Sequence, residues 1–133
     1  MAADDERYAY ILDSSALLAA VIGEPGADQV LEIIDRSAIS TVNLLEAFGK
    51  LIQKGIPAER VGGRLESFAL PAIHWSEEDV WASADLAPYA WTHGLSLGDR
   101  VCLATARKYR AQAVTTDRQW TKLVPRQKVL LVR

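Results

Sequence analysis

Two aspartates stand at the ends of short apolar runs near opposite ends of the chain. Asp13 follows residues 8–12 in the stretch YAYILDSS, and Asp117 follows the apolar pair at residues 113–114 in TTDRQW. Short apolar runs that stop at a polar residue are consistent with buried parallel strands. Such sheets bind their ligands beyond the carboxyl ends of the strands. If these two strands are neighbours, their two carboxylates meet at that edge.

A third aspartate, Asp99, begins a predicted helix after LSLG. Taken singly, each aspartate has an ordinary structural explanation, because an acid at the start of a helix caps it or interacts well with its dipole. Glu46 also has one, since it forms an i,i+4 pair with Lys50 on a polar helix stripe. No single acid therefore establishes a site.

Together the three aspartates indicate more, because all of them fall at strand ends or helix starts on one edge of the predicted sheet. Clustered carboxylates repel one another unless a cation neutralises them. Oxygen ligands without histidine or cysteine nearby suit Mg²⁺ or Mn²⁺ better than zinc. A metal at this edge would polarise a phosphodiester and activate water, as in metal-dependent nucleases.

Residues beside these acids have predicted supporting roles. Ser14 and Thr116 would orient the carboxylates or hold outer-shell waters. Arg100 and Arg118 each follow an acid directly and would contact substrate phosphates. The charge distribution allows this: residues 1–98 carry 6 Lys+Arg against 15 Asp+Glu, whereas residues 99–133 carry 9 against 2. A basic third of this kind is either a phosphate-binding surface or a solvated face that neutralises the acidic remainder.

The bulk properties fit one compact domain, spanning residues 1–133. A single cysteine, Cys102, excludes an intramolecular disulfide and suits a reducing cytoplasm. The start of the chain, MAADDERY, has no apolar region typical of a signal peptide, and no apolar run is long enough for a membrane span. We therefore expect a cytoplasmic protein without membrane association. Of the four tryptophans, most are expected in the core, with one or two exposed for a partner.

Strands are predicted to alternate with helices along the whole chain. Five short strands are expected, and between them lie helices that include a continuous one over residues 76–91 with Val80 and Trp91 on its apolar face. This alternation predicts a three-layer α/β/α fold with a central parallel sheet of four or five strands. The strands are expected at residues 8–12, 38–40, 69–75, 112–115 and 128–132.

Four short motifs resemble those of PIN-domain proteins in order and spacing: DSSALLA, STVNLLEA, LSLGDRVCLATA and VTTDRQW. The resemblance covers essentially the whole chain and is strongest to VapC-type toxins of bacterial toxin–antitoxin systems. It implies a PIN fold, Mg²⁺- or Mn²⁺-dependent endoribonuclease activity, and a homodimer neutralised by a cognate antitoxin protein. It also implies that Glu46 joins Asp13, Asp99 and Asp117 in one catalytic acidic cluster, with Ser14 and Thr116 as supporting hydroxyls.

The chain departs from the family pattern at Gln119, where many members carry a further acid. With fewer ligands, we expect one tightly held metal, and a second only with bound RNA. The departure leaves open an alternative, a catalytically inactive PIN-like module that binds RNA or protein. A receiver-like phosphoryl-transfer domain would need a lysine at the end of a strand, and neither Lys122 nor Lys128 is placed for that role.

Overall fold

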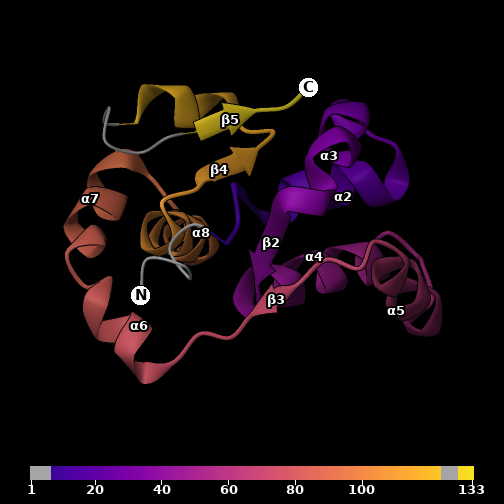
Figure 1. Ribbon diagram of the computed structural model, residues 1–133, viewed down its shortest axis with the longest axis horizontal. Helices are drawn as coiled ribbons and strands as arrows, with labels where there is room; N and C mark the ends of the chain where they lie inside the picture. Colours follow the sequence, from indigo (N-terminus) through magenta and orange to yellow (C-terminus); the bar gives the residue numbers. More distant parts are fainter. Residues whose placement is uncertain (1–6, 124–128) are drawn as a thin grey trace.

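The computed structural model describes residues 7–123 and 129–133, and its described part contains one all-parallel sheet of five strands in the order β3-β2-β1-β4-β5 (Figure 1). This confirms the predicted parallel sheet. Three strands, β1, β3 and β5, are shorter than predicted, β4 has the predicted bounds, and β2 begins one residue earlier than predicted. The expected start of the last strand at Lys128 lies outside the described residues. Their bounds are β1 (Tyr10–Leu12), β2 (Ser37–Ser40), β3 (Ala72–Ile73), β4 (Gln112–Thr115) and β5 (Val129–Leu131).

Helices cover both faces of the sheet, which confirms the three-layer α/β/α architecture (Figure 1). Because successive strand residues point to opposite faces, Leu12 packs into the core under one set of helices and Ile11 into the core under the other. The first set is α2 (Ser14–Ile22), α3 (Ala27–Ile33), α4 (Thr41–Gln53) and α5 (Ala58–Ser67). On the other face α8 (Leu97–Tyr109) contacts the sheet, and α6 (Glu77–Ala82) and α7 (Leu86–His93) pack against α8. Two 3₁₀ turns, η1 (Ile34–Arg36) and η2 (Arg118–Lys122), complete the described elements.

The sheet reverses its direction of growth at β1. Strands β2 and β3 extend it on one side, and the chain then returns to place β4 on the other, with Leu12 paired to Ile39 and to Val114. The backbone N–H of Asp13 donates to the carbonyl of Val114 at 2.9 Å. The carboxyl ends of β1 and β4 therefore lie side by side at a topological switch point, where open α/β sheets bind ligands.

The prediction of one helix over residues 76–91 is wrong. The structure has two helices, α6 and α7, separated at residues 83–85. A continuous helix would need an N–H on Pro88 to bond the carbonyl of Ala84, and proline has none. The break places Pro88 in the first turn of α7, where no such bond is required. It also changes which residues face the core: Leu86 and Ala90 are buried, whereas Val80 and Trp91 are exposed.

In the part of the chain that the structure describes, no helix is long and apolar enough to cross a membrane.

Candidate acidic site

Asp13 ends β1 and caps α2. Its Oδ1 accepts hydrogen bonds from the hydroxyl of Ser15 at 2.7 Å and from the backbone N–H of Ala16 at 2.8 Å. The residue is 5% exposed. Burial raises the pKa of its carboxyl from 3.8 to about 6, against the opposing effect of hydrogen bonds that include one from Thr115, and the nearby charge of Asp99 raises it further. Asp13 is thus an acid held in an environment that penalises its charge.

Ser15 and Thr115 join the ends of β1 and β4. Their hydroxyl oxygens lie 3.4 Å apart, and the Ser15 hydroxyl also accepts the backbone N–H of Thr116 at 3.1 Å. The backbone N–H of Asp117 donates to the Thr115 hydroxyl at 3.0 Å. The hydroxyls that contact Asp13 therefore belong to these two residues. The supporting roles assigned to Ser14 and Thr116 stay predictions; Thr116 takes part here through its backbone.

Asp99 and Asp117 both act as helix caps. In α8, Asp99 Oδ2 accepts the backbone N–H of Ser96 at 3.0 Å, and the Ser96 hydroxyl accepts the N–H of Asp99, which forms a capping box. In η2, Asp117 Oδ1 accepts the N–H of Gln119 at 2.9 Å. Each cap uses one carboxylate oxygen, and the other accepts no hydrogen bond from the described residues. Capping and metal binding are therefore compatible here.

The same two acids line one cavity of about 250 Å³ between the α7–α8 connection and η2. Gln119, Lys122 and His93 share its wall, together with the buried indole of Trp120. Sequence reasoning missed Lys122 as a cation of this edge. The side chains that line this cavity are His93, Leu95, Asp99, Asp117, Gln119, Trp120, Lys122 and Leu123, with Gly94 between them.

Glu46 comes from α4 and packs against the start of α8. A Cβ added to Gly98 would lie 2.8 Å from Glu46 Oε1, so the carboxylate occupies the space that a side chain at residue 98 would fill. The amide Nδ2 of Asn43, which is fully buried, donates to the carbonyl of Gly98 at 3.0 Å. The Ser40 hydroxyl in turn donates to the Asn43 side chain at 2.7 Å. The N-terminal part of the polar stripe of α4, at Asn43 and Glu46, thus faces the start of α8, and α4 holds the first turn of that helix.

The charges of three of the four acids act on one buried residue, Cys102. Burial together with the charges of Asp13, Asp99 and Glu46 raises the pKa of its thiol well above the usual range. Asp99 shares a cavity with Asp117, which joins the fourth acid to this group. We call these four residues the acidic cluster. The structure therefore brings together acids that are up to 104 positions apart in the sequence.

The donor chemistry of the acidic cluster fits a divalent metal such as Mg²⁺, because all of its ligand atoms are carboxylate oxygens. At the side-chain positions seen here, no three His, Cys, Asp or Glu residues of the described part lie close enough together to hold one ion. Within that part, Arg100 and Arg118 form no ion pair with the acids. Their phosphate-binding role stays a prediction, as do the catalytic and metal-binding roles of the acids.

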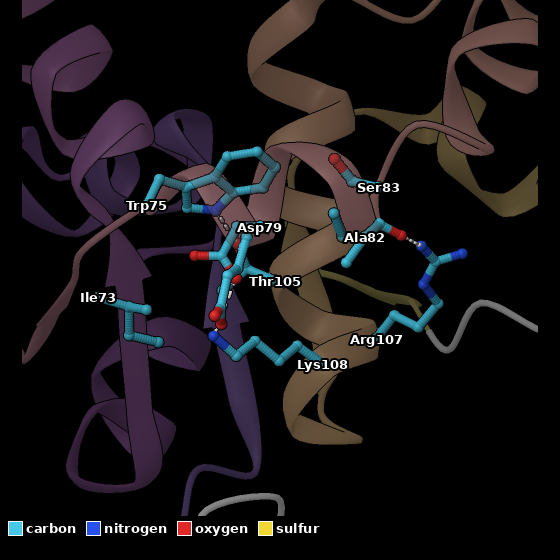
Figure 2. A pocket seen from close by; sticks show the side chains of 10 residues that line it. Ile73, Trp75, Asp79, Ala82, Ser83, Thr105, Arg107 and Lys108 are labelled. Carbon is cyan, nitrogen blue, oxygen red and sulfur yellow. Dashed lines mark hydrogen bonds and ion pairs between the residues drawn. The ribbon is translucent and has the colours of Figure 1, made fainter.

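A second cavity, of about 280 Å³, lies between α6 and α8 and includes none of the four acids (Figure 2). Three of its four charged side chains are already paired: Lys108 Nζ lies 2.9 Å from Asp79 Oδ1, and Arg107 forms two hydrogen bonds to the nearby Asp85. The indole of Trp75 donates to the Thr105 hydroxyl at 2.9 Å. This cavity is a packed junction between two helices, and we assign it no chemistry.

Comparison with known proteins agrees with this geometry. The family model described as PIN domain matches residues 10–124. No curated protein matches the chain significantly. Three similar solved structures are a VapBC2 complex from Rickettsia felis with promoter DNA, a DNA-bound VapBC from Salmonella typhimurium, and FitAcB from Neisseria gonorrhoeae.

The first of these is 20% identical, with a TM-score of 0.73 over 93% of this chain and 98% of the other. The second is 16% identical, with a TM-score of 0.73 over 92% and 97%, and the third 19% identical, with 0.67 over 91% and 96%. Likeness at these identities shows the fold. The match of the family model over most of the chain shows more: this chain belongs to the PIN-domain family.

Proposed function

We propose that this protein is a VapC-type toxin, an endoribonuclease that hydrolyses RNA phosphodiester bonds with the help of Mg²⁺ or Mn²⁺. The observation that carries the proposal is that Asp99 and Asp117 line one cavity at the carboxyl edge of the sheet, where Asp13 ends the strand next to β4. Membership of the PIN-domain family supports it, because PIN domains of VapC toxins are nucleases. The structural neighbours described as VapBC complexes support the toxin assignment.

In this proposal Asp13, Asp99 and Asp117 hold the metal, and Glu46 completes the catalytic group. When bound, the metal would offset the repulsion among the carboxylates and lower the pKa of an attacking water. In Asp99 and Asp117, one carboxylate oxygen accepts the hydrogen bond of the helix cap. The other oxygen of each carboxylate is the atom suited to binding the metal.

The protein's own groups have defined tasks around these acids. Ser15 fixes the orientation of the Asp13 carboxylate through a short hydrogen bond, and Thr115 supports both. Asn43 fixes the first turn of α8, and with it Asp99, relative to Glu46. Asp13 is thereby held by a side chain that is itself hydrogen-bonded, and the start of α8 by a buried one, which is the kind of support that precise catalysis requires.

We also propose a cognate antitoxin protein and a homodimer as partners, and the cytoplasm as the place of action. Solved neighbours described as a toxin–antitoxin complex and as a member of the VapBC family of toxin–antitoxin systems support the first of these. An antitoxin arginine placed among the carboxylates would neutralise them and block the metal. Exposed apolar side chains are available for such contacts, among them Leu45, Trp81, Trp91 and Leu97.

The proposal is tested by incubating the purified protein with total RNA in Mg²⁺ or Mn²⁺ and mapping the cut ends. We expect discrete cuts that EDTA abolishes. RNA that is bound without any cutting in either metal would favour the inactive binding module instead and would refute the nuclease assignment.

A further inference from the structure

Lys50 occupies a position in the site that the sequence did not indicate. It lies on α4 one turn after Glu46, and the sequence alone suggests a solvated i,i+4 ion pair. In the structure its Nζ lies 3.4 Å from the hydroxyl oxygen of Ser14 and 4.0 Å from Glu46 Oε2. Ser14 is buried and directly follows Asp13. The ammonium group therefore lies between the start of α2, next to Asp13, and the Glu46 carboxylate on α4.

We propose that Lys50 binds a backbone phosphate of the RNA at the acidic cluster and so positions the substrate for cleavage. This inference rests on the proposed ribonuclease function and names a substrate contact for it. It differs from the phosphate contacts predicted for Arg100 and Arg118, because it comes from the acid-rich part of the chain.

The interactions of the Lys50 ammonium group with Ser14 and Glu46 are weak enough for a phosphate to replace them. A distance of 3.4 Å is at the outer limit of a hydrogen bond, and 4.0 Å is at the limit of an ion pair. An ammonium group has three N–H donors. The side chain is 48% exposed, so a ligand can reach it. An exposed i,i+4 pair contributes only a few tenths of a kcal/mol, so exchanging Glu46 for a phosphate costs little.

The charge of the site explains why such a cation is needed. RNA is a polyanion, and four carboxylates at the cleavage site repel its backbone. Two of the cations in the basic third, Arg107 and Lys108, are already paired with acids elsewhere. A lysine beside Glu46 and the start of α2 attracts the phosphate toward the place where the metal would act. The contact is to the backbone, so it raises affinity without selecting a sequence.

The test uses steady-state cleavage of a short fluorescein-labelled RNA that contains a mapped cut site, at fixed Mn²⁺ and a series of KCl concentrations. Lys50→Gln removes the charge, Lys50→Arg retains it, and Lys54→Gln is the matched control. Lys54 is the C-cap of the same helix and is exposed, and within the described residues its side chain forms no hydrogen bond or ion pair. Thermal midpoints of all variants report any structural role.

We expect Lys50→Gln to raise KM several-fold with kcat nearly unchanged. The plot of log kcat/KM against log salt should become shallower by about 0.7, the value for one lost phosphate contact to single-stranded nucleic acid. Lys50→Arg should restore most of the affinity, and Lys54→Gln should behave as wild type. Equal KM and equal salt slope for Lys50→Gln and Lys54→Gln, with an active wild type, would overturn the inference alone. An inactive wild type would overturn the proposed function, and this contact with it.

Discussion

At the scale of single residues, burial distinguishes Asp13 from the other acids. Its folded-state pKa of about 6 lies above its ordinary value of 3.8, so the folded state binds more protons between these two values. The free energy of unfolding of the metal-free protein therefore falls as pH rises from about 4 to about 6, and levels off above. At neutral pH the buried charge costs roughly 1–3 kcal/mol. Functional residues often lower the stability of a protein in this way.

This predicts that Asp13→Asn stabilises the metal-free protein. Asparagine retains an oxygen that can accept the hydrogen bonds of Ser15 and Ala16, and it removes the charge. In urea unfolding with EDTA at pH 7, we expect the variant to be more stable than wild type by about 1–3 kcal/mol. The difference should disappear below about pH 4. The control is Asp28→Asn, at an exposed position in α3. A variant less stable than wild type at pH 7 would contradict the burial argument.

The acids themselves could be predicted from the sequence, but their supporting residues could not. Asp13 and Asp117 end apolar runs, a pattern visible in one dimension. Ser15 and Thr115 are neighbours of the hydroxyl residues that sequence reasoning chose. Which of two adjacent hydroxyls faces the carboxylate depends on the exit angle of each strand, and no sequence pattern sets that angle. The repeated hydroxyls DSS and TTD were the available signal.

At the scale of elements, the contact between α4 and α8 decides where Glu46 points. The sequence predicted a helix that carries Glu46 and another that begins near Asp99, and the structure has both. It also predicted the polar stripe of α4, which includes Asn43 and Lys50. It could not show that this stripe faces α8 and α2, because a helical wheel separates polar from apolar faces without identifying the neighbour. The buried Asn43 and the close fit of Glu46 against Gly98 are visible only in three dimensions.

This contact predicts an effect of Gly98→Ala on activity. The new methyl group would lie 2.8 Å from Glu46 Oε1, so the carboxylate must move. Because it is the end of a flexible side chain, the fold should tolerate the change. A misplacement of about 1 Å at a catalytic group can lower the rate by about a hundredfold. We expect a similar loss in kcat for RNA cleavage, with the thermal midpoint close to that of wild type.

Gly49→Ala is the matched control for this substitution. Gly49 lies in α4, and a Cβ there would contact nothing within 4 Å. Replacing it should raise stability by roughly 0.5–1 kcal/mol through helix propensity and leave cleavage unchanged. Equal rates for the two glycine variants would show that the position of Glu46 does not matter for cleavage.

At the scale of the whole molecule, the parallel sheet brings distant segments together. The alternation of strands and helices predicted this architecture, and the order β3-β2-β1-β4-β5 makes neighbours of β1 and β4. The basic segment, residues 99–133, in contrast had two interpretations that the sequence could not separate: a phosphate-binding surface, or a face that neutralises the acidic remainder. For Arg107 and Lys108 the structure favours the neutralising one, since they pair with Asp85 and Asp79. Net charge by segment says nothing about which charges are paired in the fold.

The central claim is that this fold assembles one cleaving centre from separate acids. It is tested most directly by the rate of RNA cleavage in Mn²⁺ for wild type, Asp117→Asn and the exposed-position control Asp28→Asn. Asparagine retains an oxygen to cap η2, so the fold should persist, and circular dichroism checks this. We predict that Asp117→Asn cleaves at least about a hundredfold more slowly than wild type, while Asp28→Asn matches it. A folded Asp117→Asn variant that cuts RNA at the wild-type rate would contradict the account.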